Sequence, residues 1–399
     1  MERKLIVTKN KDQVYTALLE DHILAELHLS EKDPKRMAAG DIYIGKIKKI
    51  NANIGAMFIE TAPGIECYCP LKLANEPFFS KKAGKKPLCI GDELVVEIKK
   101  EASKGKIPSV TTDFSIKGRL AVLVHGKENI GVSGKIPPVR KAELKQWASG
   151  FHMENCGLIL RTGAAKAEKE TILSETDKLQ EQYQSLLQTA PFRTCFSCLY
   201  KAPPEYLEVF RNHYAAELTE IVTDDPDLYQ EIRDFLEKEM PSLLHALRKY
   251  EDAMLPLRKF YNLDMELTHA LAEKVWIRYG GFLVIQPTEA LTVIDVNSGK
   301  CTEGKDREKT FLKLNIEAAR EAARQIRLRN LSGIILIDFI NLAREEDTQS
   351  LMHFFREELA KDPVRTNLID VTKLQLVEVT REKVKKPLSE CVKGQTGPI

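Results

Sequence analysis

Apolar and polar residues alternate along the first thirty positions, which is typical of half-buried β-strands. Residues 14–21 (VYTALLED) and 22–30 (HILAELHLS) predict a hairpin that turns near Glu20 and Asp21. From Gly40 to residue 116, short β-rich runs are separated by Gly, Asn and Pro. Five such strands predict a small closed barrel.

The remainder of the chain predicts three further parts. Residues 119–200 contain short strands (LAVLVHG and CGLILRT) and then a polar helical run from about Ala165 to Leu187, which indicates a separate α/β module. Residues 204–275 are mostly helical in period. The last third alternates strands with long helices, so we expect a layered α/β domain with a largely buried sheet. The pattern as a whole predicts a multidomain α/β (α+β) protein.

Composition narrows this picture only slightly. A chain of 399 residues favours two to four domains. Because 60 Lys and Arg nearly balance 58 Asp and Glu, any affinity for nucleic acid has to come from local clusters of basic residues. The eight cysteines follow no disulfide framework. No signal peptide and no membrane span is recognisable, and we expect a cytoplasmic protein.

Aromatic residues alternate with lysines in the predicted barrel. Phe58 lies on one strand and Tyr68 on the next, and Lys106 follows in a basic segment. Such a surface could stack bases and hold phosphates. Alternatively, the aromatic rings fill the barrel core and the lysines only solvate it. The pattern leaves both interpretations open.

Two aspartates end apolar runs in the last third of the chain. Asp295 follows Leu291 to Ile294, and Asp338 follows Ile334 to Ile337. Buried carboxylates are costly unless they are paired, protonated or bound to a cation. Oxygen ligands without nearby His or Cys favour Mg²⁺, with Mn²⁺ as a substitute. Asn297 would share the face of Asp295 and could orient a phosphate. The alternative is that each aspartate caps a helix or binds loop amides.

A long helix is expected between the two aspartates. Its apolar stripe would lie on the sheet. Its arginines are interpreted as a solvated face and not as a phosphate clamp. These arginines are Arg320, Arg324, Arg327 and Arg329.

The barrel segment GDIYIGKIKKINANIGAMFIE, residues 40–60, resembles an S1-like RNA-binding domain, which is a variant of the OB-fold. The resemblance implies that Phe58, Tyr68 and Lys106 face RNA. Tyr68 stands where such domains often have Phe, a change that keeps the stacking surface.

Three segments of the last third resemble the catalytic core of the ribonuclease E and ribonuclease G family: LTVIDVNSGK, EAARQIRLRNLSGIILIDFI and LVEVTREKV. The resemblance implies that Asp295 and Asp338 hold a catalytic Mg²⁺ and that Asn297 assists at the scissile phosphate. It further implies that Arg161 and Thr162 recognise a 5′-monophosphate on the RNA. An Arg fork and a Thr hydroxyl suit a terminal phosphate.

The same resemblance assigns an architecture. Residues 1–38 and 207–271 would form a discontinuous RNase H-like structural domain, into which the S1-like barrel is inserted. The barrel would span 39–117, the 5′-sensor module 118–206, the DNase I-like catalytic domain 272–386 and a tail 387–399.

Two positions depart from the family pattern. Most members carry a Cys-Pro-x-Cys motif through which two subunits share a zinc ion, whereas this sequence has Cys391 alone in that region. A shared four-thiolate site needs two cysteines per subunit, which calls structural zinc and the usual homodimer into question. Gln375 stands where glycine is usual, next to the expected active site.

The resemblance implies a Mg²⁺-dependent endoribonuclease that cleaves single-stranded RNA with 5′-monophosphate sensing, acting in rRNA maturation or mRNA turnover. Two alternatives stay open. One is an RNA-binding protein of the same fold that does not cut, and the other is a deoxyribonuclease, since metal-held carboxylates can serve either polymer.

Overall fold

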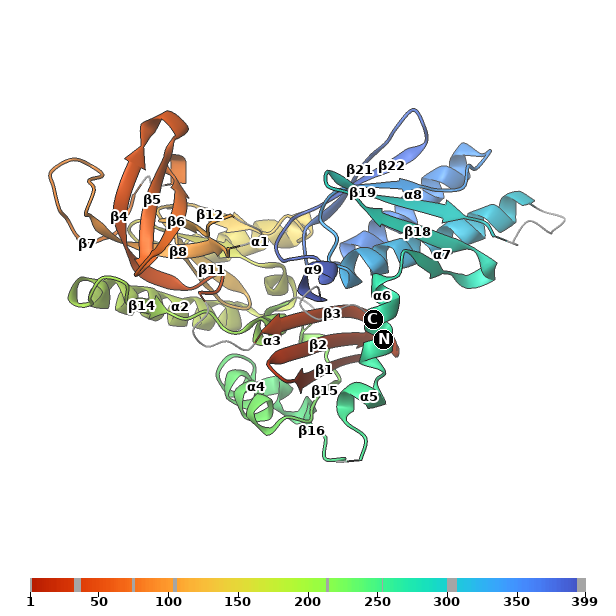
Figure 1. The fold of residues 1–399 in the computed structure, drawn as a ribbon, viewed down its shortest axis with the longest axis horizontal. Coiled ribbons are helices and arrows are strands. Elements are labelled where there is room, and N and C mark those ends of the chain that lie inside the picture. The colour runs from red at the N-terminus through yellow and green to blue at the C-terminus, as the bar shows by residue number, and fades with distance from the viewer. Residues whose placement is uncertain are drawn as a thin grey trace. The chain divides into compact units, whose positions relative to one another are not determined.

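The computed structural model divides the chain into two compact units, which are described separately (Figure 1). Unit 1 comprises residues 1–32 and 216–399, and unit 2 comprises residues 33–215. No helix within the described residues combines the length and apolarity needed to cross a membrane. The structure describes residues 2–31, 37–73, 76–102, 106–212, 215–252, 254–299 and 307–392.

Unit 2 contains the predicted five-stranded barrel. Its strands pair in the order β4, β5, β6, β9, β8, and β8 pairs again with β4, which closes the barrel. Inward residues such as Met57, Ile59 and Cys67 form its core. The strands are β4 (Ile42–Asn51), β5 (Ala56–Ala62), β6 (Ile65–Pro70), β8 (Glu93–Lys100) and β9 (Ser109–Thr111), with the short β7 (Phe79–Lys81) and β14 (Cys198–Tyr200) added outside.

A second sheet in unit 2 has the order β10, β11, β13, β12. The predicted helical run begins later than expected, because residues 162–166 form a 3-10 turn and α2 starts at Lys169. Apolar side chains of α1 and α2 pack with those of the strands in one core. The elements are β10 (Ser115–Lys117), β11 (Ala121–His125), β12 (Ile130–Val132), β13 (Cys156–Leu160), α1 (Pro138–Ala148) and α2 (Lys169–Thr189).

In unit 1 the second and third strands form the predicted hairpin, and they belong to a sheet of order β16, β15, β1, β2, β3. The expectation that residues 204–275 are mostly helical is wrong at two short strands: β15 pairs in parallel with β1, and β16 pairs in parallel with β15. Strands of three or four residues show no period of their own, so tertiary pairing decides them. The strands are β1 (Arg3–Asn10), β2 (Gln13–Glu20), β3 (Ile23–Glu31), β15 (Glu220–Thr223) and β16 (Leu247–Lys249).

In sequence, helices precede and follow each of these short strands. Asp225 caps α4, where its carboxylate accepts a hydrogen bond from Leu228 N at 2.9 Å. The helices are α3 (Glu205–Glu208) at the end of unit 2, and α4 (Pro226–Glu239), α5 (Leu257–Phe260) and α6 (Leu263–Leu271) in unit 1.

The last third of the chain forms a six-stranded sheet of order β17, β18, β19, β20, β22, β21. Small residues of α7, such as Ala318 and Ala322, pack with apolar residues of α8 and of one sheet face. The elements are β17 (Lys274–Trp276), β18 (Phe282–Pro287), β19 (Leu291–Asn297), α7 (Arg307–Leu328), β20 (Gly333–Asp338), α8 (Glu345–Ala360), β21 (Thr366–Val371), β22 (Leu376–Arg381) and α9 (Leu388–Val392).

The opposite face of this sheet, called the open face below, is not buried. Its side chains are half-buried or exposed; the side chain of Ile334, for example, is 51% exposed. The expectation of a largely buried sheet is therefore wrong for this face. The strands read as continuous apolar runs because the open face also carries apolar residues, such as Val293 and Leu336.

The arginines of α7 also correct an expectation. Arg327 is 6% exposed, and its Nη2 donates to Glu20 Oε2 at 2.7 Å on β2. Arg329 is also buried, and its Nη2 donates to Ala272 O at 2.7 Å. Arg324 donates to Leu24 O on β3 at 2.5 Å. Arg324 and Arg327 therefore connect α7 to the first sheet of unit 1, and Arg329, just after α7, contacts the segment that follows α6. Three of the four arginines predicted to be solvated thus make contacts within unit 1.

Candidate functional site

Strand pairing brings the two aspartates together. The strands β19 and β20 are parallel neighbours, and Asp295 and Asp338 are direct partners in their register. Partners on adjacent strands lie about 4.8 Å apart and point to the same face. Because both residues lie at or near the carboxyl ends of their strands, their carboxylates share one edge of the open face, where open α/β sheets place ligands.

Neither aspartate is buried. The buried residues beside Asp295 are Ile294 and Val296, which point to the helices, whereas Asp295 and Asp338 are exposed on the open face. The premise that burial alone demands a cation is therefore wrong. The feature that favours a bound cation is the close approach of two negatively charged carboxylates.

The electrostatics of the pair reflect that approach. Partial desolvation and then the charge of Asp295 raise the pKa of Asp338 above its ordinary value. Asn297 stands two residues along the same face, and its Nδ2 donates to Asp295 Oδ2 at 2.7 Å. The structure thus brings all three predicted residues to one place.

The capping alternative fails for Asp338. The next helix, α8, begins at Glu345, and its N-cap residue is Arg344. Across the described ranges, no group of three or more His, Cys, Asp or Glu side chains is arranged to hold a metal. The site therefore offers two carboxylates and one amide, and a bound cation would have to take its other ligands from water or substrate.

The predicted phosphate-binding pair lies where β13 ends. Arg161 is half-buried, its backbone N donates to Leu120 O, and its Nη1 donates to Gly118 O at 2.7 Å. The Thr162 hydroxyl lies 2.9 Å from the hydroxyl of Ser133, just after β12. Sequence reasoning missed Ser133, because only the parallel pairing of β12 with β13 brings residues 29 positions apart together.

The predicted RNA-facing aromatics lie on the outside of the barrel. Phe58 and Tyr68 are partners on β5 and β6, with ring centroids 6.2 Å apart at 73°. Both are half-buried, and they alternate with the core residues Met57 and Cys67. The alternative that these two rings fill the barrel core is therefore wrong. Lys106 is exposed and precedes Pro108, whose carbonyl accepts from Tyr68 N at 2.8 Å.

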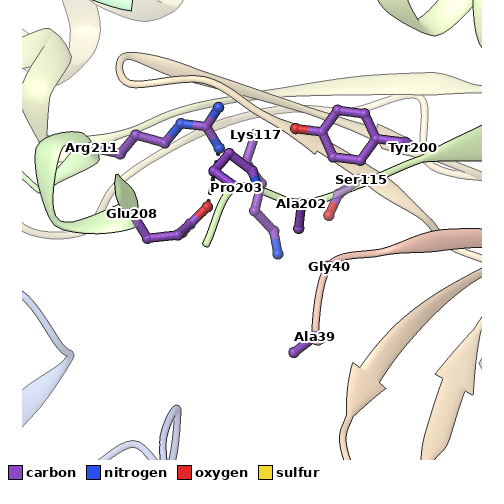
Figure 2. A pocket seen from close by; sticks show the side chains of 9 residues that line it. All are labelled: Ala39, Gly40, Ser115, Lys117, Tyr200, Ala202, Pro203, Glu208 and Arg211. Atoms are coloured by element: carbon purple, nitrogen blue, oxygen red, sulfur yellow. Dashed lines mark hydrogen bonds and ion pairs between the residues drawn. The ribbon is translucent and has the colours of Figure 1, made fainter. Parts of the chain in front are cut away.

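Figure 2 shows a small pocket in unit 2 that contains none of the predicted site residues. Its basic side chains already contact carboxylates: Arg211 Nη1 lies 3.1 Å from Glu208 Oε1, and Lys117 Nζ lies 3.3 Å from Glu97 Oε1. The lining residues are Ala39, Gly40, Ser115, Lys117, Tyr200, Ala202, Pro203, Glu208 and Arg211. The pocket gives no support to a second phosphate site.

Two pairs of cysteines that are close in sequence, Cys67 with Cys69 and Cys195 with Cys198, lie in different surroundings. Cys67 and Cys69 are buried in the barrel, and burial raises the pKa of the Cys69 thiol to about 12. Cys195 and Cys198 lie nearer the surface, and desolvation raises the pKa of both thiols. Cys391 is part of α9 and packs against the apolar core beside the first sheet of unit 1.

Comparison with known proteins gives a consistent result. The family model described as "Ribonuclease E/G family" matches residues 115–384. Ribonuclease G of Salmonella typhimurium (strain SL1344) is 28% identical over 97% of this chain and 81% of its own length. Ribonuclease G of Haemophilus influenzae is 29% identical over 97% of this chain and 80% of its own length. Ribonuclease E of the same species is 27% identical over 98% of this chain and 42% of its own length.

Proposed function

The chain belongs to the ribonuclease E/G family, and from this premise we propose that it cleaves single-stranded RNA internally by Mg²⁺-dependent hydrolysis in RNA processing or decay. Relatives named ribonuclease G and ribonuclease E align with nearly the whole chain, which supports an endoribonuclease. The observation that carries the chemical proposal is the register of β19 and β20, which makes Asp295 and Asp338 partners.

The donor set fits Mg²⁺. Two carboxylates at one sheet edge provide hard oxygen ligands and too few ligands for a closed protein cage, as is usual for Mg²⁺ at phosphate-processing sites. Mn²⁺ accepts the same ligands. When bound, the ion activates water and neutralises charge that builds on the phosphate.

The residues of the chain then have separate roles. Asp295 and Asp338 hold the cation, and their mutual repulsion is relieved on binding. Asn297 uses one N–H to hold the Asp295 carboxylate in place. Its second N–H would donate to a phosphate oxygen, because an amide nitrogen carries two donors.

Recognition of the RNA 5′ end is assigned to unit 2. Arg161 would bind a terminal monophosphate through the donors of its guanidinium fork, and the hydroxyls of Thr162 and Ser133 would add neutral donors. The contact of Arg161 with Gly118 O supports this role, because it fixes one end of the guanidinium.

Replacing this arginine tests the assignment. Arg161→Ala should lower the preference for 5′-monophosphate over 5′-hydroxyl RNA by about 10- to 100-fold, since hydrogen bonds to charged groups contribute about 1.5–3 kcal/mol. The ratio of kcat/KM on the two substrates measures it. Arg193→Ala removes an exposed arginine from the same unit and should leave the ratio unchanged. Equal loss on both substrates would refute a role in 5′ recognition.

The barrel is assigned to binding of the single strand. Phe58 and Tyr68 present ring surfaces outside the barrel core, and Lys106 adds an exposed charge near the same edge. Stacking on such rings contributes about 1–3 kcal/mol per base and tolerates many sequences. This surface would hold RNA while the carboxylates of unit 1 act on it.

The domain architecture proposed from the family is an S1-like barrel at 39–117, a 5′-sensor module at 118–206, an RNase H-like domain at 1–38 and 207–271, and a DNase I-like domain at 272–386. The sheet that joins β1 with β15 supports a discontinuous first domain. In the tail, 387–399, residues 393–399 lie outside the described residues.

One assay tests the proposed function. The full chain is incubated with a 5′-monophosphorylated single-stranded RNA in Mg²⁺ or in excess chelator. Internal cleavage in Mg²⁺ alone is expected, with 5′-phosphate and 3′-hydroxyl product ends. RNA that is bound but uncut would favour the non-catalytic alternative. Unchanged cleavage after the ribose at the cut site is replaced by deoxyribose would be compatible with a deoxyribonuclease.

A further inference from the structure

Two aromatic side chains lie beside the candidate site on the open face. Trp276 of β17 pairs with Phe282 of β18, and Phe282 pairs with Asn297 of β19. Paired residues on neighbouring strands point to the same face. Trp276, Phe282 and Asn297 therefore form one row, directly next to the row that holds Asp295 and Asp338.

The two rings are accessible to solvent, and the ammonium group of Lys274 lies next to them. Trp276 is 65% exposed, and its ring centroid lies 5.3 Å from that of Phe282 at 62°. Lys274 Nζ lies 4.2 Å from the centroid of Trp276 and 3.6 Å from that of Phe282. These cation–π contacts fix the two rings and place a positive charge among them.

We infer that Trp276, supported by Phe282 and Lys274, forms a stacking subsite for the nucleobase next to the scissile phosphate. The inference rests on the proposed function. Trp276 lies two strands, or about 10 Å, from Asn297, the residue proposed to orient the scissile phosphate, so the base that adjoins this phosphate lies within reach of the indole. The exposed indole provides a stacking surface, and the Lys274 ammonium suits a flanking phosphate. Charge and continuity with the candidate site thus favour RNA over a second protein surface.

Trp276 can report on stacking directly, because the chain contains only one other tryptophan, Trp147. Trp147→Phe leaves Trp276 as the reporter, and Asp295→Asn added to it keeps the RNA intact. Saturating single-stranded RNA should quench the emission, whereas an abasic strand of the same length should quench it far less. Unchanged emission at saturation, verified by anisotropy of labelled RNA, would overturn the inference.

Cleavage provides the second readout. Single abasic positions are placed in turn around the cut site of a 5′-monophosphorylated RNA. For the unmodified chain, one position beside the cut should lower kcat/KM by about tenfold. In Trp276→Ala the base at that position should no longer matter, and Trp276→Phe should restore most of its effect. Phe192→Ala, which removes an 89% exposed ring from unit 2, should keep the original profile.

The outcomes separate this inference from the proposed function. Absence of Mg²⁺-dependent cleavage would refute the function, while the fluorescence titration would still decide the stacking. Cleavage with the same abasic profile in Trp276→Ala would refute the stacking alone. A change of Trp276 emission with protein concentration without RNA, together with a lower mass in solution for Trp276→Ala, would overturn the inference in favour of a contact between two copies.

Discussion

Replacing Asp295 by asparagine should abolish RNA cleavage and leave RNA binding nearly unchanged. Asparagine keeps the size of the side chain but removes one of the two negative charges that face each other across β19 and β20. A metal at this site contributes several kcal/mol to the transition state, and each 1.36 kcal/mol is a factor of ten in rate. We therefore expect kcat to fall by about 1,000-fold or more, measured on 5′-monophosphorylated RNA, with affinity measured by anisotropy.

A matched control separates chemistry from net charge. Asp234→Asn removes one negative charge from an exposed position of α4 in the same unit, and it should keep the original kcat. Asp338→Asn should lose activity as Asp295→Asn does, because the two carboxylates act on one ion. Turnover that survives in Asp295→Asn would remove this residue from the mechanism.

The sequence predicted this site because its signals are local. A carboxylate at the end of an apolar run marks a strand end, and two such runs separated by one long helix predict parallel neighbours. The pairing of Asp295 with Asp338 follows from this pattern once the register is known. Asn297 needed only the two-residue period of a strand.

Features that depend on register across the sheet could not be predicted. Trp276 and Phe282 belong to short runs with no motif, and only the antiparallel pairing of β17, β18 and β19 brings them beside Asn297. Because both faces of the six-stranded sheet carry apolar residues, the sequence pattern could not indicate which face is open. Likewise, an arginine on the helix face opposite the apolar stripe is predicted to be exposed to solvent. Arg327 instead contacts Glu20, more than 300 positions away in the sequence.

Gln375 was predicted from the sequence only in part. The family resemblance marked it as a replacement for glycine, and it adopts φ +66°, in the left-handed region that favours glycine. It immediately precedes Leu376, which is the β22 partner of Asp338. The turn thus keeps the conformation that glycine would favour, at some cost in strain.

Arg381→Met should lower the free energy of unfolding of unit 1 by about 3–5 kcal/mol, because removing one partner leaves a buried charge unpaired. Arg381 is 5% exposed and Asp362 1%, and Arg381 Nε donates to Asp362 Oδ2 at 2.7 Å. The guanidinium also donates to Asn330 Oδ1 at 2.5 Å and to Leu331 O at 3.0 Å. Urea unfolding followed by circular dichroism measures the loss.

A second substitution tests the cause. Adding Asp362→Asn to Arg381→Met removes the uncompensated charge. The single oxygen of the asparagine side chain can still accept from Val364 N, which donates to Asp362 Oδ1 at 2.9 Å, and its amide can donate to the Thr366 hydroxyl, which lies 2.9 Å from Asp362 Oδ2. The double variant should therefore recover part of the lost stability, although it changes two buried residues. Arg356→Met, at an exposed position of α8, should stay within about 0.5 kcal/mol of the original. A double variant less stable than Arg381→Met would mean that shape, and not the unpaired charge, sets the cost.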